Sequence, residues 1–409
     1  MWLYNLGISL YAGGIRLAAL WHGKARLWSE GRRNIFERME AAVRPSDRIV
    51  WVPAASLGVF EQARPTIERL RAEHPEYKIL LTFFSPSGYE IRKNYEGADY
   101  VFYLPADTPS NARRFLDIVH PEIAIFIKYE FWINLLSELR RRKVRSYIVS
   151  AIFRRNSVFF RPYGAMWRQA LETFDTLFVQ NVESKRLLSE IGFDNVVVAG
   201  DTRFDRVAQI AAAAQRVETI ERFRGGGRLF VAGSTWGPDE EILLPLVNAN
   251  PDVKFVIAPH EMDEGRIAHL MRDAKGGAVR YTQCDAATRF DDVQVLVLDT
   301  MGMLSSVYGS ATWAYVGGGF GVGIHNTLEA ATFGLPIAFG PNYGKFKEAR
   351  DMVSLGCAVS VRTAGELAAW FAPLRDDEET LRRASRTAKD YTARNQGATG
   401  IILRSIFNS

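Results

Sequence analysis

The chain has 409 residues, more than one compact core usually holds, so two domains are expected. Hydrophobic residues make up 47% of it and charged residues 24%, a globular composition that excludes a disordered or fibrous protein. Its two cysteines, Cys284 and Cys357, form no CxxC pattern, so neither a disulfide framework nor a zinc site is indicated and a reducing cytoplasm fits.

The formal net charge of +5 is unevenly distributed. Residues 1–208 carry 30 lysines and arginines against 23 acidic residues, whereas the remainder carries 21 against 23. A basic first half suits an acidic partner, such as a phosphorylated lipid, an anionic membrane face or a nucleic acid. A solvated basic surface is the alternative. No nucleic-acid partner is expected, because the chain has neither a reading motif nor interleaved aromatic and basic residues.

The first 21 residues, MWLYNLGISLYAGGIRLAALW, are apolar over nearly the length that spans a bilayer, although Asn5 and Arg16 interrupt them. A cleavable signal peptide is not indicated, because the positive charge follows the apolar run. Residues 1–33 are therefore expected to form a membrane anchor, either a spanning helix or an interfacial helix with aromatic residues at headgroup depth. A helix packed on its own domain is the remaining alternative.

Strand-like apolar runs then alternate with amphipathic helices, as in DRIVWV followed by FEQARPTIERLRAEH, and the alternation restarts with LFVAGS at residue 229. This pattern predicts parallel βαβ units and the α/β fold class, with two Rossmann-like domains. The expected domains are 34–208 and 228–376, joined by a linker at 209–227. A last helix, 377–409, can cross back onto the first domain. Ligands of such proteins bind in a cleft at the carboxyl ends of the strands.

The stretch VPAASLGVFEQARP, residues 52–65, reads as a strand end, a small-residue turn and a helix that opens near Gly58. Such a turn suits an acidic or phosphorylated ligand, because the first N–H groups of a helix have no partner within it. The next residue is Val59, whose side chain neither accepts nor donates a proton. The turn is therefore either a catalytic turn that lacks its base or a binding turn.

The strongest motif is YVGGGFGVGIHNTLEAATFGLPIAFGPNYGKF, residues 315–346. Its glycines allow close approach of a ligand, and Asn326 can cap a helix whose N-terminus attracts phosphate. Glu329 would lie in the first turn, where a carboxylate can accept hydrogen bonds from both ribose hydroxyls of a nucleotide. A tight turn with a capped helix and a surface glutamate is the alternative.

Two shorter turns repeat this arrangement. Gly233 and Ser234 close one strand, and Pro259 and His260 end the next, where His260 can donate to a phosphate or carboxylate. No Asp-x-Asp, HExxH or P-loop motif is present, so no metal and no other cofactor is expected. Helix N-termini and histidine or arginine donors can balance a leaving phosphate instead.

Together these segments resemble the 3-deoxy-D-manno-octulosonic acid (Kdo) transferases of lipopolysaccharide synthesis, over nearly the whole chain. The likeness includes WVPAASLGVFEQARP, TFFSPSGYE, KYEFW, VQNVESKRLLSEIGF, GDTRFD, AGSTWGPDEE, APHE and GIHNTLEAATFGLPIAFGP, with spellings most like Bacteroidetes-type members. The resemblance implies a GT-B fold and an inverting, metal-independent glycosyltransferase. It implies transfer of Kdo from CMP-Kdo to the lipid A precursor, an acylated glucosamine disaccharide bisphosphate, at the cytoplasmic side of the inner membrane with its anionic lipids.

The same resemblance implies particular site residues. The C-terminal domain would bind CMP-Kdo through Gly233, Ser234, Pro259, His260, Gly318, Gly319, His325, Asn326 and Glu329. The N-terminal domain would bind the acceptor through Ser56, Gly58, Ser85 and Gly88, and KYEFW supplies Glu130 as a catalytic candidate. Basic residues would meet the acceptor phosphates, and the apolar N-terminal helix would meet its acyl chains.

The chain departs from this family at the catalytic turn, which usually reads His-x-Ala-Ser-x-Gly-Glu. Pro53 stands at the histidine position, Val59 at the position of the candidate general base, and Lys128 where many members have a glutamate. A general base typically contributes about 10²–10⁴-fold to a rate. Glu61 can substitute only if residues 59–61 are extended, because in a helix it lies about 200° around the axis from Val59.

Three functions remain open at this point. The first is a Kdo transferase. The second, motivated by Pro53 and Val59, is a catalytically impaired paralogue or variant that still binds CMP-Kdo. The third is a GT-B glycosyltransferase that uses another sugar nucleotide as its donor.

Overall fold

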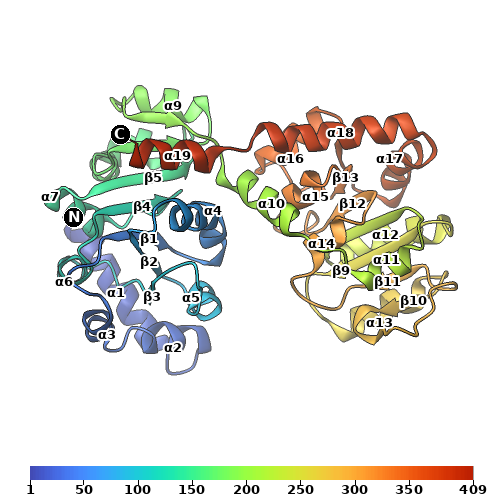
Figure 1. Ribbon diagram of the computed structural model, residues 1–409, viewed down its shortest axis with the longest axis horizontal. Helices are drawn as coiled ribbons and strands as arrows, with labels where there is room; N and C mark the ends of the chain where they lie inside the picture. Colours follow the sequence, from blue (N-terminus) through green and yellow to red (C-terminus); the bar gives the residue numbers. More distant parts are fainter. Residues whose placement is uncertain (409) are drawn as a thin grey trace. The chain divides into compact units, whose positions relative to one another are not determined.

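A computed structural model describes residues 1–408, which divide into two units. Unit 1 comprises Met1–Arg206 together with the chain from Gln396 onward, and unit 2 comprises Val207–Asn395. Within the described residues each unit is built on a seven-stranded sheet whose neighbouring strands pair in parallel (Figure 1). The α/β fold class expected from the alternating pattern is therefore observed.

The sheet of unit 1 has the order β3-β2-β1-β4-β5-β6-β7. Its strands are β1 Ile49–Ala54, β2 Lys78–Phe83, β3 Tyr100–Tyr103, β4 Ile123–Ile127, β5 Arg145–Ala151, β6 Thr176–Val179 and β7 Val196–Val198. Every residue of β1 and β4 is buried, as expected for central strands covered by helices on both faces. Because the chain adds β2 and β3 on one side of β1 and later strands on the other, the strand order reverses between β1 and β4.

Helices cover both faces of this sheet. They are α1 Trp2–Ala18, α2 Gly23–Glu30, α3 Ile35–Ala42, α4 Leu57–Glu73, α5 Pro86–Arg92, α6 Pro109–Val119, α7 Ile133–Arg142, α8 Ala165–Leu171, α9 Val182–Ser189 and α19 Ala398–Phe407, and α10 Thr202–Ala213 continues into unit 2. Apolar side chains of α3, α6, α7 and α8 form the core on one face. Those of α4 and α19 form the core on the other.

The C-terminal segment returns to unit 1, where Figure 1 shows α19 beside the N-terminal sheet. The Asp205 carboxylate accepts hydrogen bonds from the backbone N–H of Gly397 at 2.6 Å and of Thr399 at 2.7 Å. The expected single helix over 377–409 is wrong, because α18 Glu378–Arg394 ends before α19 begins. Gly397 separates them with a left-handed φ of +105°, a conformation that interrupts a right-handed helix.

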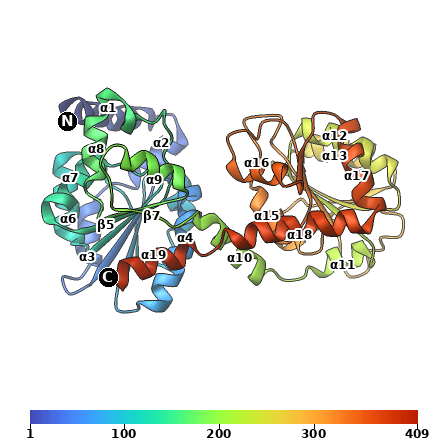
Figure 2. The same cartoon turned by 90° about the horizontal axis from the view of Figure 1, so that it is seen from above.

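The sheet of unit 2 has the order β10-β11-β9-β8-β12-β13-β14, so its order reverses between β8 and β12. Its strands are β8 Leu229–Thr235, β9 Lys254–Pro259, β10 Ala278–Arg280, β11 Val295–Val297, β12 Trp313–Val316, β13 Ile337–Phe339 and β14 Ala358–Ser360. Its helices are α11 Glu218–Arg224, α12 Gly237–Ala249, α13 Glu264–Asp273, α14 Leu304–Tyr308, α15 Thr327–Thr332, α16 Lys347–Ser354, α17 Ala364–Asp376 and α18. Figure 2 shows α12, α13 and α17 on one side of this sheet and α11, α15 and α18 on the other. The segment 209–227 contains the end of α10 and all of α11.

The N-terminal helix α1 is attached to unit 1 by a buried polar cluster. The Tyr4 hydroxyl donates to Asp107 Oδ2 at 2.6 Å, and Asn134 Nδ2 donates to Asn5 Oδ1 at 2.9 Å. Asp107 also accepts from the backbone N–H of Asn134 at 3.0 Å, and burial raises the pKa of this carboxyl. Among residues 1–408 no helix combines the length and the apolar character needed to cross a bilayer, so the expected spanning anchor is not found.

Candidate active site

Each sheet has one place where its strand order reverses, and open α/β sheets bind ligands at the carboxyl ends of the strands that flank this reversal. In unit 1 these strands are β1 and β4, which are followed by Ala55–Gly58 and by Lys128–Glu130. In unit 2 they are β8 and β12, which lead into Trp236 and into Gly317–Gly319. The segments singled out from the sequence therefore lie at both reversal points.

In unit 1 the two predicted acceptor turns lie side by side. The backbone N–H of Ser85 donates to the carbonyl of Ala55 at 2.9 Å. Ser56 has extended backbone angles and precedes α4, while Ser85 caps α5 by accepting from the N–H of Ser87 at 3.3 Å. Gly88 is buried in the first turn of α5. A Cβ added to Gly58 would meet no atom within 4 Å apart from its chain neighbours and the backbone of its own helix, so the first turn of α4 has space on that side.

Glu130 lies directly behind this turn and is only 5% exposed. Its Oε1 accepts a hydrogen bond from the N–H of Ala55 at 3.0 Å, and its Oε2 accepts from Trp132 Nε1 at 2.9 Å. Burial raises the pKa of the Glu130 carboxyl to about 7, although both hydrogen bonds oppose the shift. Unit 1 thus holds a carboxyl group at its reversal point that changes charge near neutral pH.

The departures from the expected catalytic turn have structural counterparts. Val59 is half-buried and packs against the apolar cluster between α4 and the sheet, so it acts there as a core side chain. Pro53 is buried within β1, opposite Thr82 of β2. Residues 59–61 belong to α4, so the extended geometry that would let Glu61 replace the base is absent from this segment.

Glu61 is held in an ion-pair cluster instead. Its carboxylate lies 2.8 Å from Arg92 Nη2, 3.1 Å from Arg206 Nε and 3.9 Å from Arg64 Nη1. These arginines come from α5, α10 and α4, so Glu61 joins three helices of unit 1.

Strained backbone marks both reversal points. Lys128, the residue after β4, has a φ of +52°, and Ser234, the second-last residue of β8, has a φ of +55°. Non-glycine residues rarely adopt this left-handed conformation, and those that do gather at functional sites. The strand pairing of β8 with β9 also shifts between Gly233 and Thr235, which re-aims the end of β8.

In unit 2 three rings gather where β8, β9 and β12 end. The His260 and His325 rings stack with their centroids 4.3 Å apart, and the Trp236 ring lies 4.9 Å from that of His260. Trp236 Nε1 donates to His325 Nε2 at 3.3 Å, which places the proton of a neutral His325 on Nδ1. Burial, and then the charge of His260, lower the pKa of His325. Pro259 ends β9 and positions His260, whose N–H donates to the carbonyl of Thr235 at 2.9 Å.

The Asp239 carboxylate holds the backbone beside these rings through hydrogen bonds. This fully buried carboxylate accepts hydrogen bonds from the N–H of Trp236 at 2.9 Å, the N–H of Gly318 at 2.9 Å and the Tyr315 hydroxyl at 2.7 Å. Burial raises its pKa. Sequence analysis missed both Trp236 and Asp239. The signal for Asp239 was available, because an acidic residue three positions after a helix N-cap is the spacing of a capping box.

The glycines of the 317–319 loop meet protein backbone. Gly318 has a φ of +90°, which favours glycine, and a Cβ on Gly319 would lie 2.5 Å from the Cα of Gly340. The loop therefore packs on the FGP turn at 339–341. This contact explains Gly319 without a ligand.

Asn326 and Glu329 interact at the start of α15. Asn326 Oδ1 accepts from the N–H of Leu328 at 3.2 Å and so caps the helix, while its Nδ2 donates to Glu329 Oε1 at 2.9 Å. Ser305 Oγ donates to Glu329 Oε2 at 2.9 Å. Both carboxylate oxygens of Glu329 therefore already accept hydrogen bonds, and its role toward a ribose stays a prediction.

Comparisons with known proteins agree with these motifs. The family model described as 3-deoxy-D-manno-octulosonic-acid transferase (kdotransferase) matches residues 32–206. The 3-deoxy-D-manno-octulosonic acid transferase of Haemophilus influenzae is 25% identical over 378 residues, covering 88% of this chain and 86% of that protein. The transferase of Bordetella pertussis is 27% identical over 373 residues, covering 87% and 86%, and that of Aquifex aeolicus is 25% identical, covering 78% and 83%.

Solved structures agree on the fold at lower sequence identity. UDP-GlcNAc 2-epimerase from Neisseria meningitidis is 15% identical, covers 88% of this chain and 100% of its own, and has a TM-score of 0.64. MurG from Acinetobacter baumannii is 13% identical, covers 89% and 100%, and has a TM-score of 0.55. At these identities the likeness concerns the fold alone.

Proposed function

We propose that this protein is a member of the Kdo transferase family, to which it is similar over most of its length, and that it transfers Kdo from CMP-Kdo to the lipid A precursor in lipopolysaccharide synthesis. The observation that carries the proposal is positional: two of the family's characteristic segments in each unit follow the strands that flank the order reversal of its sheet. They are WVPAASLG and KYEFW in unit 1, and AGSTWGPDEE and the glycine-rich segment that leads into GIHN in unit 2. Relatives that match most of the chain support the same reaction.

Unit 2 would hold the donor. The stacked rings of His260 and His325 stand at the strand ends, and the Nδ1–H of His325 is available as a donor because Nε2 accepts from Trp236. An imidazole N–H suits the phosphate of CMP or the carboxylate of Kdo. The remaining donor residues would be Gly233, Ser234, Pro259, Gly318, Gly319, Asn326 and Glu329. Trp236 joins them because it fixes the tautomer of His325.

Unit 1 would hold the acceptor at the turns of Ser56, Gly58, Ser85 and Gly88. In the reaction an acceptor hydroxyl oxygen bonds to the anomeric carbon of Kdo while the bond from that carbon to the CMP phosphate oxygen breaks. The hydroxyl proton needs a base, and Val59 cannot supply one. We assign this role to Glu130, whose pKa of about 7 leaves it partly ionised at neutral pH and whose carboxylate contacts Ala55 of the turn. The transfer would be inverting and metal-independent.

The N-terminal helix would place unit 1 on the cytoplasmic face of the inner membrane. While Tyr4 and Asn5 face the body, a series of large apolar side chains on α1 and the following turn is exposed: Trp2 71%, Leu3 66%, Leu10 68%, Leu17 60%, Leu20 77% and Trp21 71%. An exposed apolar helix face followed by cations suits an interfacial position on an anionic membrane. Acyl chains of the acceptor would meet the same face.

A transfer assay tests this proposal. Purified protein is given CMP-Kdo and the tetra-acylated disaccharide 1,4′-bisphosphate, and the chain is compared with Val59→Glu, which restores the family's usual base. Turnover by the unaltered chain supports the proposal and Glu130 as base. Turnover by Val59→Glu alone supports the architecture but not Glu130 as base.

Binding measurements separate the alternatives. If neither protein transfers Kdo yet both bind CMP-Kdo in calorimetry, the chain is a donor-binding paralogue that has lost its chemistry. If a UDP-sugar raises the melting temperature more than CMP-Kdo does, the third function, another donor, is correct. Absence of CMP-Kdo binding and of transfer by both proteins contradicts the proposal.

A further inference from the structure

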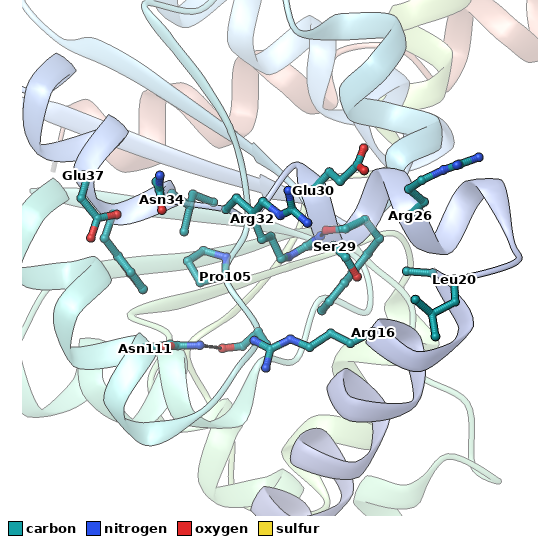
Figure 3. Close-up of a pocket in the computed structure, with 16 residues that line it drawn as sticks. Arg16, Leu20, Arg26, Ser29, Glu30, Arg32, Asn34, Glu37, Pro105 and Asn111 are labelled. Carbon is teal, nitrogen blue, oxygen red and sulfur yellow. Dashed lines mark hydrogen bonds between the residues drawn. The ribbon is translucent and has the colours of Figure 1, made fainter.

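A pocket of about 760 Å³ lies in unit 1, between α1, the segment that joins α2 to α3, and the loop that precedes α6 (Figure 3). Four arginines and two glutamates line it, together with apolar side chains. The charged lining residues are Arg16, Arg26, Arg32, Arg33, Glu30 and Glu37. The function proposed above does not use this pocket.

Arg32 forms the fixed part of the pocket. Its guanidinium donates to three backbone carbonyls, those of Leu104 at 2.8 Å, Trp28 at 3.0 Å and Phe84 at 2.7 Å. It also stacks on the Trp28 ring, with its Cζ 3.9 Å from the ring centroid. A guanidinium has five N–H groups, so two remain for another acceptor.

The charge of Arg32 is not balanced by the protein. Among residues 1–408 no carboxylate forms an ion pair with it, and burial lowers its pKa to about 9. A cation removed from water without a partner is costly, whereas an anion in the pocket would compensate it. The position therefore favours a negatively charged ligand.

Other donors point to the same ligand. Ser29 lines the pocket, and its Oγ is buried without a hydrogen-bond partner among the described residues. Arg16 has no ion pair there either, and Figure 3 shows it extending from α1 toward Asn111, with Arg32 and Ser29 across the pocket. Of the two glutamates, Glu37 pairs with Arg114 at 3.2 Å. Arg26 points away from the pocket centre in Figure 3 and is left out of the site.

We propose that this pocket binds the phosphate group of a membrane lipid, with Arg32, Arg16 and the Ser29 hydroxyl as its donors. Guanidinium groups match the oxygen geometry of phosphate better than a point charge does. The lipid source is argued from α1, because the same helix supplies Arg16 and Leu20 to the pocket and carries the exposed apolar side chains. A headgroup in the pocket would leave its acyl chains beside that apolar face.

Vesicle co-flotation tests the proposal with the full chain. Vesicles of phosphatidylcholine are compared with vesicles that also contain phosphatidic acid, and with vesicles brought to the same surface charge by oleate, a carboxylate. We expect tighter binding to phosphatidic acid than to oleate. Equal binding to both would overturn the proposal, because charge alone would then explain the attraction.

Ser29→Ala is the decisive variant, because it removes one hydroxyl and no charge. We expect about ten-fold weaker binding to phosphatidic acid, as for a hydrogen bond to a charged group, with an unchanged melting temperature because Ser29 Oγ has no partner to lose. Arg16→Gln should weaken binding at least as much. Lys24→Gln is the matched control, since Lys24 lies on α2 outside this pocket and its loss should cost only the roughly five-fold effect of a surface charge.

Unchanged phosphatidic acid binding by Ser29→Ala, or equal losses for Arg16→Gln and Lys24→Gln, would overturn the pocket as a site. Competition then separates the sources of the phosphate. Displacement by the tetra-acylated disaccharide bisphosphate but not by inorganic phosphate supports a substrate lipid, and displacement by neither supports a bilayer lipid. Equal displacement by inorganic phosphate would overturn a lipid ligand. None of these readouts requires Kdo transfer, so a failed transferase assay would leave the result standing.

Discussion

The reversal points of the two sheets have the same topology but opposite placement of their titratable groups. In unit 1 the turn itself is neutral, and a carboxyl group that accepts a hydrogen bond from it, Glu130, is buried behind it. In unit 2 the titratable rings of His260 and His325 stand on the turns, while a buried carboxylate, Asp239, holds the backbone beneath them. The shared fold puts both candidate sites at the carboxyl ends of strands, whereas the depth of each charged side chain differs, and with it the chemistry that each site could support.

Glu130→Gln breaks the unit 1 side of this comparison and has the largest expected effect. If Glu130 is the base, the transfer rate falls about 10²–10⁴-fold while CMP-Kdo binding in calorimetry stays unchanged. A base acts when deprotonated, so the rate of the unaltered chain should rise as pH increases through about 7, and the variant should lose this rise. A normal pH profile in the variant would show that Glu130 only supports the turn.

Glu130→Gln should also change how the free energy of unfolding depends on pH. The folded-state pKa of about 7 lies above the ordinary value of 4.5, so the folded state binds more protons between these values. The contribution of Glu130 to the free energy of unfolding should therefore decrease as pH rises from about 4.5 to 7, and Glu130→Gln should lack this contribution. Urea unfolding at several pH values measures the difference.

Asp239→Ala tests the unit 2 side of the comparison by removing a buried acceptor of backbone hydrogen bonds. It leaves the N–H groups of Trp236 and Gly318 and the Tyr315 hydroxyl without their buried acceptor, at a cost of roughly 2–5 kcal/mol. Thermal or urea unfolding checks this loss. Glu241→Ala on the same helix is the control, since Glu241 is exposed and should change stability by less than about 0.5 kcal/mol. Similar stability of the two variants would contradict the role assigned to Asp239.

His325→Ala tests whether the ring cluster of unit 2 contributes to binding of the sugar donor, CMP-Kdo. We expect about ten-fold weaker CMP-Kdo binding, the effect of one hydrogen bond to a charged group. Trp236→Phe keeps an aromatic ring but removes the N–H that donates to His325 Nε2, so a smaller loss of a few-fold is expected. Calorimetry measures both. Full affinity in both variants would remove the ring cluster from the proposed donor site.

Gly58→Ala and Gly319→Ala compare how much space each turn leaves for an added methyl group. Of all the predicted changes in stability, that of Gly58→Ala is the smallest. A Cβ at Gly58 would meet no atom within 4 Å apart from its chain neighbours and its own helix backbone. Stability at this helical position should therefore change by at most about 1 kcal/mol, in the favourable direction. A Cβ at Gly319 would lie 2.5 Å from Gly340 Cα, so Gly319→Ala should destabilise unit 2 by roughly 1–3 kcal/mol through overpacking. Melting temperatures test the pair; a large loss in Gly58→Ala would show that α4 does not open as described.

The sequence by itself determined the α/β class and the segments at the strand ends, because burial on both faces of a parallel strand requires continuous apolar runs and the turns after them have distinctive compositions. It also shows a valine at position 59, where the resemblance to Kdo transferases predicts a general base, since the identity of a residue is local information. Asn326 was correctly expected to cap a helix for the same reason.

Only the tertiary structure decided which of these segments meet. The contact between Glu130 and Ala55 joins residues 75 positions apart, and the bond from Gly318 to Asp239 joins residues 79 apart. The raised pKa of Glu130 depends on burial by many other residues, and the uncompensated Arg32 depends on carbonyls from three separate segments. Desolvation and long-range hydrogen bonding are properties of the folded chain, so no local pattern of residues encodes them.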